Sequence, residues 1–406
     1  MISTRILPML AAGILLAAVG TVPTESRAQA TPRASYDFED GAPVFTAISF
    51  NDGQISPDGG ATVAVVRDQV KSGTGALSYS YKVEPKVFRA LTVGARLPAG
   101  TQSARFWVKS TTQSVLMLAL REEDGSNYQH AFHVPAHEWV QVTGNLDEFA
   151  LAEGTDENKK LDPDQVSSAS FTDFAALLVS LNDDVAKAFP QIAGPRQFWL
   201  DDLQFGTERV PQATGVVHSG MAGSYLVDNF ETGVVQWLPV RAVFVAAPSF
   251  ELLPQNTTLK VLTEAAAPGA GKLPLEPGGK GLRYTYQRGD KEAYALVRSL
   301  ERVDLARADR LRLSLNVSRK SLLLVQVKEK DDSEYQSLIM PDDSVGWRNL
   351  DLALTELTLG NDSKDENGKL DPGQIKDLSI MDASSFLNLP GGDTTLDVDA
   401  VSFTLK

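Results

Sequence analysis

One acidic phrase occurs twice in this sequence, and each copy contains several closely spaced oxygen ligands. Residues 156–165 read Asp-Glu-Asn-Lys-Lys-Leu-Asp-Pro-Asp-Gln, and residues 365–374 read Asp-Glu-Asn-Gly-Lys-Leu-Asp-Pro-Gly-Gln. In both copies Asp stands before Pro, so its carboxylate can cap a helix whose first residue is that Pro. Gln three residues after this Asp nearly completes a capping box. We therefore expect each copy to form a loop tip, one short helical turn and then a strand.

The second copy also has some of the spacing of a calcium-binding loop. If Gly368 is the central glycine of an EF-hand-type loop, then Asp365, Asn367 and Asp371 occupy its third, fifth and ninth positions. Gln374 stands where such a loop requires a bidentate Glu, and the first copy has Lys in place of the glycine. Helix capping by the aspartates is therefore the preferred interpretation.

A sugar-binding site needs an aromatic surface for the C–H groups of the ring and polar groups for its hydroxyls. Residues 116–122 and 323–329 are matching apolar strands, each followed by an acidic turn and a Tyr. Because side chains alternate along a strand, one polar set should face outward from each. The predicted ligand-binding residues near the ends of these strands are Arg121, Asp124, Tyr128, His130, Lys328, Asp331 and Tyr335.

Catalytic patterns are absent from the sequence. It has no nucleophile elbow, His-Glu-x-x-His helix, P-loop or dinucleotide fingerprint. His130 and His133 should lie on opposite faces of an extended strand, which argues against a zinc site. Paired carboxylates are too common in so acidic a chain to identify a glycosidase. We therefore predict that the protein is not an enzyme.

Charge and composition exclude further classes. The chain has 38 basic and 52 acidic residues, a net charge of −14 and no Cys. This charge repels nucleic acid, and no basic stripe offsets it, so a nucleic-acid partner is not expected. It favours divalent cations, although solubility explains it equally well.

The first thirty residues have the pattern of a signal peptide. Arg5 precedes an apolar run over residues 6–20, and Ala28-Gln29-Ala30 has the form of a cleavage site. We expect cleavage after Ala30 and a secreted or periplasmic, cell-envelope location. No later segment approaches ~20 apolar residues, so membrane insertion is not expected.

The whole chain is an internal duplication. Trp139 and Trp347 lie 208 residues apart, and the acidic phrases are offset by 209. Each half consists of short alternating strands separated by Gly, Pro, Asn and Asp clusters. We predict an all-β protein of two tandem antiparallel β-sandwich (jelly-roll) domains. Its predicted parts are residues 1–30 as signal peptide, 31–206 as domain 1, 207–224 as linker and 225–406 as domain 2.

The order of phrases in each half resembles a known superfamily. Phe-Glu-x-Gly is followed by Leu-x-Tyr-x-Tyr, then Leu-Asp-Pro-x-Gln, and finally a closing strand such as residues 198–205. This order resembles galactose-binding-like jelly rolls, in particular carbohydrate-binding modules of family 11 and the complex I intermediate-associated protein family. The resemblance implies a glycan groove on a concave sheet and structural calcium. The matching calcium ligands are Glu39 with Asp201 or Asp202, and Glu231 with Asp399.

Together these observations predict a secreted, non-catalytic carbohydrate-binding protein. Its expected ligand is a polysaccharide or cell-envelope glycan, and calcium would stabilise the sandwiches. Two alternatives remain open at this point. One is a structural or adhesive envelope protein that binds protein partners, and the other is an unrecognised polysaccharide hydrolase.

Overall fold

The computed structural model describes residues 35–41, 44–51, 54–154, 156, 160–181, 183–210, 223–244, 249–262, 280–300, 303–340, 346–360 and 363–406. The chain divides into two compact units between residues 211 and 212. We call the described residues 35–210 the N-domain and the described residues 223–406 the C-domain. The predicted signal peptide and most of the predicted linker lie outside the described residues, so the predicted domain boundaries stay predictions.

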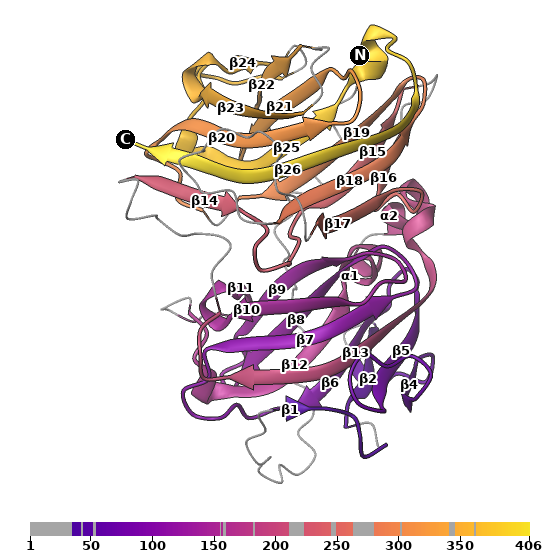
Figure 1. Cartoon of the computed structure of the whole chain (residues 1–406). Coiled ribbons are helices and arrows are strands. Elements are labelled where there is room, and N and C mark those ends of the chain that lie inside the picture. The colour runs from indigo at the N-terminus through magenta and orange to yellow at the C-terminus, as the bar shows by residue number, and fades with distance from the viewer. Residues whose placement is uncertain are drawn as a thin grey trace. The chain divides into compact units, whose positions relative to one another are not determined.

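Over its described residues, the N-domain consists of two antiparallel sheets (Figure 1). The six-stranded sheet has the order β10-β7-β13-β5-β4, with β1 paired to β13. Its strands are β1 (Ser35–Tyr36), β4 (Thr62–Val66), β5 (Ala76–Val83), β7 (Ser103–Ser110), β10 (Val140–Asn145) and β13 (Gly194–Gly206). The seven-stranded sheet has the order β11-β9-β8-β12-β6-β2-β3. Its strands are β2 (Thr46–Asn51), β3 (Gln54–Pro57), β6 (Phe88–Gly94), β8 (Ser114–Glu122), β9 (Asn127–Val134), β11 (Ala150–Glu153) and β12 (Val166–Asp173).

Short helices occupy the connections of the N-domain. They are η2 (Leu146–Glu148), η3 (Pro163–Gln165), α1 (Phe174–Leu181), α2 (Asp183–Ala188) and η4 (Pro190–Ile192). The first α-helix contacts β5 of one sheet and β6, β8 and β12 of the other, so it closes one end of the sandwich. Over the described residues of the whole chain, none of the helices has the length and apolarity needed to cross a membrane.

The C-domain repeats this plan over its described residues. Its six-stranded sheet has the order β17-β18-β26-β20-β23, with β14 paired to β26, and its seven-stranded sheet has the order β16-β15-β19-β25-β21-β22-β24. The first sheet contains β14 (Ser224–Asp228), β17 (Thr258–Leu262), β18 (Gly281–Arg288), β20 (Ala308–Val317), β23 (Trp347–Ala353) and β26 (Gly392–Leu405). The second contains β15 (Leu238–Val243), β16 (Ser249–Leu252), β19 (Glu292–Ser299), β21 (Leu323–Glu329), β22 (Glu334–Ile339), β24 (Thr358–Leu359) and β25 (Ile375–Asp382). Its short helices are η5 (Leu354–Glu356), η6 (Pro372–Gln374) and η7 (Ser384–Leu387).

Alternation of side chains builds the core of each domain. Every second residue of the Leu-x-Tyr-x-Tyr phrase points inward and is buried, namely Leu77, Tyr79 and Tyr81 in β5 and Leu282, Tyr284 and Tyr286 in β18. Burying one large apolar side chain stabilises the fold by roughly 1.5–3 kcal/mol. The predicted class, two tandem all-β antiparallel sandwiches, is confirmed.

A buried carboxylate joins the two sheets of the N-domain. Asp173 ends β12 and accepts a hydrogen bond from the Tyr81 hydroxyl at 2.6 Å. The Arg196 guanidinium lies 3.3 Å from the same carboxylate. The other oxygen of Asp173 accepts from the backbone N–H of Ala175 at 2.8 Å, in the first turn of α1. These donors compensate the cost of burying the charge.

The C-domain has the same arrangement, but its arginine comes from another strand. Asp382 accepts from the Tyr286 hydroxyl at 2.7 Å and from the Ser384 N–H at 3.0 Å. Its cation is Arg288 of β18, at 3.2 Å, whereas Arg196 of the N-domain lies on β13. The requirement is therefore a cation at this point in space, and either of two neighbouring strands can supply it.

The duplicated phrase has the predicted local structure. Each copy runs into one 3₁₀ turn with Pro at its start, followed directly by a strand. Asp162 caps the first copy by accepting from the N–H of Asp164 at 3.1 Å. In the second copy the Asp371 carboxylate accepts instead from the side-chain amide of Asn367 at 3.0 Å. The capping interpretation is thus confirmed for the first copy and wrong for the second.

Candidate glycan-binding faces and carboxylate clusters

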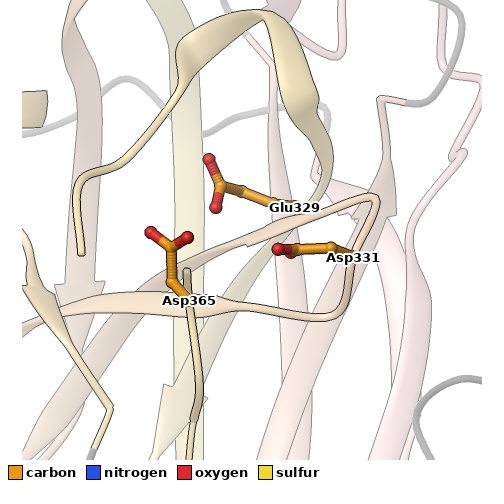
Figure 2. Close-up of side chains that lie close together, drawn as sticks. All are labelled: Glu329, Asp331 and Asp365. Carbon is orange, nitrogen blue, oxygen red and sulfur yellow. The ribbon is translucent and has the colours of Figure 1, made fainter. Parts of the chain in front are cut away.

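Three carboxylates meet at one edge of the C-domain. Glu329 ends β21, Asp331 lies in the turn that follows, and Asp365 begins the second copy of the acidic phrase. One oxygen of each side chain lies within 4.8 Å of the others. Figure 2 shows the three side chains close together; they come from the end of β21, the turn that follows it and the acidic loop.

Hydrogen bonds from neighbouring residues hold each of these carboxylates in place. Glu329 accepts from the backbone N–H of Asp371 at 2.6 Å. Asp331 accepts from the N–H of Ser333 at 2.9 Å. Asp365 accepts from the hydroxyl of Tyr335, which pins the acidic loop to β22.

The cluster carries excess negative charge. Burial, together with the neighbouring Asp331 and Asp365 carboxylates, raises the pKa of Glu329 to about 7. By contrast, the hydrogen bond from the Tyr335 hydroxyl lowers the pKa of Asp365. A cation near Glu329 would remove the cost of ionising it.

The N-domain repeats the hydrogen bonds of this cluster, although among the described residues only the C-domain carboxylates have oxygens that all lie within 4.8 Å of one another. Glu122 ends β8 and accepts from the backbone N–H of Asp162. Asp124 accepts from the N–H of Ser126 at 2.8 Å. The Tyr128 hydroxyl donates to Asp156, as Tyr335 does to its own partner. Burial raises the pKa of Glu122 as well.

These oxygens suit a hard divalent cation such as calcium, which binds carboxylates and carbonyls. Sequence reasoning did not single out Glu122 or Glu329 as ligands, because a Glu at the end of a strand resembles an ordinary solvent-facing residue. The available signal was an acid two residues before Asp124 and Asp331, in the same place in both halves.

The calcium ligands implied by resemblance in the N-domain hold backbone amides. Glu39 accepts from the N–H and the hydroxyl of Thr74 at 2.9 and 2.6 Å, and these bonds lower its pKa. Asp201, which is 1% exposed, accepts from the N–H groups of Lys71 and Ser72. Asp202 has a left-handed backbone, and its carboxylate accepts from Gln204 at 2.6 Å. These placements do not test metal binding.

The negative charges of the C-domain counterparts, Glu231 and Asp399, are less well compensated by hydrogen bonds. Glu231 accepts from the N–H of Lys280 at 3.2 Å. Burial raises the pKa of Asp399 to about 7, and the carboxylates of Glu231 and Asp228 act in the same direction. A cation would be stabilised here, so the pair remains a candidate calcium site.

The predicted sugar-binding residues of the N-domain separate onto two faces. Arg121 points outward, opposite Asn127, and Asp124 is exposed. Tyr128 and His130 point inward instead and are 0% and 5% exposed. Their burial leaves no ring face for a sugar, because they lie opposite Leu120 and Leu118 of the core.

The C-domain residues behave in the same way. Asp331 is exposed, whereas Tyr335 is buried in the core. Lys328 points outward as expected, but its ammonium group is 3.3 Å from Asp332 and 3.4 Å from Glu334. Whether any of the exposed residues contacts a glycan stays a prediction.

A row of small polar side chains crosses the outward face of the seven-stranded sheet in the N-domain. From β2 to β9, residues directly opposite one another are Thr46, Thr92, Ser170, Ala119 and Gln129. The adjacent inward residues, such as Leu118, belong to the core. Three of these five residues carry hydroxyl groups, and we call the five together the hydroxyl row.

Two buried polar groups in this face have no hydrogen-bond partner among the described residues. They are the amide nitrogen of Gln129 and both ring nitrogens of His133, whose residues are 6% and 3% exposed. Burial lowers the pKa of His133 to about 3, so its ring is neutral at physiological pH. A buried polar group without a partner costs about 1–3 kcal/mol.

An apolar surface lies on the same face. Phe50 and Phe88 are directly opposite each other on β2 and β6, and both are half-buried. Aromatic side chains can cover the C–H faces of a sugar ring. The outward face thus combines hydroxyls, unsatisfied donors and an aromatic pair.

The same face of the C-domain is different. The row equivalent to the hydroxyl row reads Leu238, Val297, Ser379, Gln326 and Gln336, and the adjacent row is Val240, Ala295, Met381, Leu324 and Leu338. The second row is entirely apolar. The duplication has therefore preserved the scaffold while changing the chemistry of this surface.

Comparison with known proteins finds similarity only at the level of structure. No family model matches the sequence, and no curated protein matches it. One similar solved structure is the family 11 carbohydrate-binding module of the cellulosomal cellulase Lic26A-Cel5E of Clostridium thermocellum. The two are 17% identical, with a TM-score of 0.33, over 45% of this chain and 95% of the module.

A second similar structure is a tandem. The CBM22-1-CBM22-2 tandem domain of Paenibacillus barcinonensis Xyn10C is 14% identical, with a TM-score of 0.29, over 93% of this chain and 99% of the tandem. The expected resemblance to carbohydrate-binding modules is thus found among solved structures. The resemblance to the complex I intermediate-associated protein family stays a prediction.

Proposed function

We propose that this protein is an exported, non-catalytic carbohydrate-binding protein. It holds a polysaccharide or cell-envelope glycan against the outward face of the seven-stranded sheet in the N-domain. The observation that carries the proposal is the row of hydroxyl side chains across that face, which ends at Gln129 and lies on the same face as the half-buried pair Phe50 and Phe88. Sugar hydroxyls both donate and accept, so they can pair with this row and with the Gln129 amide.

Affinity electrophoresis of the intact chain tests this proposal. The gels contain mixed-linkage β-glucan, xylan, β-1,4-galactan or a cell-envelope glycan, and retardation by at least one of them is expected. Gln129→Ala should weaken the retarding interaction about tenfold, because one lost hydrogen bond is worth about 1.4 kcal/mol.

The matched control is Gln336→Ala, which changes the equivalent residue of the C-domain and should leave the retardation unchanged. Retardation by none of the glycans would remove the proposal. Equal loss in both variants would show that the face with the hydroxyl row is not the binding face. Release of new reducing ends from any of the polysaccharides would overturn the non-catalytic assignment.

Calcium is the second part of the proposal. We propose that it binds at the clusters around Glu122 and Glu329, with Glu231 and Asp399 as a further site. The excess of carboxylates around Glu329 and its raised pKa support a cation there. Its role would be to lock the acidic loop against the strand that ends at Glu329, rather than to contact substrate.

One observation favours a protein partner for the C-domain. One row of its outward face is apolar, and Leu338 and Met340 are 55% and 61% exposed. An adhesive role that joins an envelope protein to a glycan is therefore the second candidate function. Retention on cell walls that survives Gln129→Ala but is lost in Leu338→Asp would favour this alternative.

A further inference from the structure

A cavity of about 420 Å³ opens in the C-domain, away from the carboxylate cluster. It lies between the hairpin that joins β18 to β19 and the residues that begin β26. Gln287 and Gly289 line it from the hairpin, and Gly391 lines it from the other side. Its volume falls in the range of small-molecule sites, about 300–1,000 Å³.

Two glycines line the cavity where its residues pack closely. A Cβ atom at Gly289 would lie 2.8 Å from a carboxylate oxygen of Glu292, and one at Gly391 would lie 2.6 Å from the carbonyl oxygen of Arg288. A side chain at either position would therefore displace another residue of the lining.

The cavity is lined by fixed polar groups. The hydroxyl of Tyr294 is held between the carbonyl oxygen of Gln287, at 2.8 Å, and the carboxylate of Glu292, at 2.7 Å. Arg241 bridges Glu251, at 3.0 Å, and Glu292. The Nε atom of Arg241 is buried and has no hydrogen-bond partner among the described residues.

The charges exclude an anionic ligand. Both arginines that line the cavity are already paired with carboxylates: Arg241 as above, and Arg288 with Asp382 at 3.2 Å. Asp290 adds a further carboxylate at the rim. Both arginines of the lining are therefore neutralised by carboxylates, so a uronate or phosphate would find no unpaired cation among the lining residues.

The N-domain provides an internal comparison. Lys86 and Lys291 occupy the same left-handed position in the two hairpins, with φ of 64° and 59°. Counting from them, Glu84 of the N-domain is equivalent to Gly289. Glu84 accepts from Arg89 at 2.8 Å, so an ion pair fills the place that the C-domain leaves open.

We propose that this cavity is a second ligand site, which binds a short neutral saccharide. The inference rests on the proposed carbohydrate-binding function but concerns a different surface, in the other domain. The ligand's hydroxyls would meet the guanidinium of Arg241, the carboxylate of Glu292 and the exposed amide of Gln287. The volume of the pocket suits a short saccharide.

Isothermal titration of the intact chain tests the proposal. The probes are galactose, glucose, xylose, their β-1,4-linked disaccharides and, as the charged comparison, galacturonic acid. We expect at least one neutral saccharide to bind and galacturonic acid to bind at least tenfold more weakly. Gly289→Glu imports the N-domain residue and should abolish this binding. Gln287→Ala, a change at an exposed side chain, should weaken it several-fold.

Lys82→Ala, at the N-domain position equivalent to Gln287, is the matched control and should bind normally. Unchanged binding in Gly289→Glu would overturn the site, as would tighter binding of galacturonic acid than of neutral saccharides. Retardation on polysaccharide gels without any binding of short saccharides would overturn this site and leave the proposed function intact. Absence of both would overturn the two together.

Discussion

Removing the side-chain hydroxyl should affect the stability of the N-domain differently at two tyrosines of one strand. Tyr79 and Tyr81 both lie on β5, are 1% and 6% exposed, and have rings stacked 4.7 Å apart. The Tyr81 hydroxyl donates to the buried carboxylate of Asp173 at 2.6 Å. The hydroxyl of Tyr79 is buried and has no hydrogen-bond partner among the described residues. Tyr81→Phe and Tyr79→Phe therefore remove the same atom from similar surroundings, with different consequences.

The expected loss of stability in Tyr81→Phe follows from the hydrogen bond that Asp173 loses. A hydrogen bond to a charged group contributes about 1.5–3 kcal/mol. Arg196 still pairs with the carboxylate after the change, so we expect Tyr81→Phe to cost about 2 kcal/mol. The buried, unpartnered hydroxyl of Tyr79 already lowers the stability of the folded state. Tyr79→Phe should therefore be neutral or should stabilise the domain by up to about 1 kcal/mol.

Urea unfolding followed by tryptophan fluorescence measures both variants. Trp107, Trp139 and Trp199 report on the N-domain. For a domain of this size, 2 kcal/mol corresponds to a fall in Tm of about 4–8 °C. The m-value should stay constant, since neither variant changes the surface exposed on unfolding.

Equal losses in the two variants would refute the reasoning, because ring packing would then matter more than the hydroxyl bond. A neutral Tyr81→Phe would refute it as well, since Asp173 would not need this donor. Tyr286→Phe in the C-domain offers an independent repetition, because its hydroxyl donates to Asp382 at 2.7 Å.

Three further predictions concern metal, pH and backbone. Calcium at one hundred times its Kd should stabilise the protein by about 2.7 kcal/mol relative to a sample with chelator, as measured by melting curves. Asp331→Asn should reduce this stabilisation. Identical melting curves with calcium and with chelator would contradict the metal proposal. Burial lowers the pKa of His133 from 6.5 to about 3, so the unfolded chain binds the proton first as pH falls. Stability present above pH 6.5 should decrease by about 1.4 kcal/mol by pH 5.5, and His133→Gln should lose correspondingly less between pH 7.5 and 5.5 in urea titrations; an equal loss would contradict this. Gly75→Ala would place its Cβ 2.4 Å from the carbonyl oxygen of Phe38 and should lower the stability of the N-domain by about 1–3 kcal/mol. Gly59→Ala, with no neighbour within 4 Å, should change that stability by less than about 0.5 kcal/mol. Similar Tm values for the two variants would show that the backbone around Gly75 can move to accept a side chain.

The duplication and the inward and outward faces of the main strands could be predicted because both are local properties. Side chains alternate along a strand with a period of two, so Leu118 and Val325 had to share one face and Arg121 and Lys328 the other. The turn after each Leu-Asp-Pro phrase was equally predictable, because Pro fixes the first helical position. The burial of Tyr128 opposite Leu120 could not be predicted, because the partner of a strand residue is not known without the register.

Tertiary structure decided which of these residues meet. Glu329 and Asp365 are far apart in sequence, and only the docking of the acidic loop onto β22 brings their oxygens together. The same holds for the unpartnered amide of Gln129, which is noticeable only once its neighbours across the sheet are known. Periodicity determines the direction of a side chain from its own segment, whereas contact depends on pairing between distant segments, whose order no local pattern encodes. The sequence by itself therefore determined two sandwiches and their faces, and the fold decided where on them a ligand can bind.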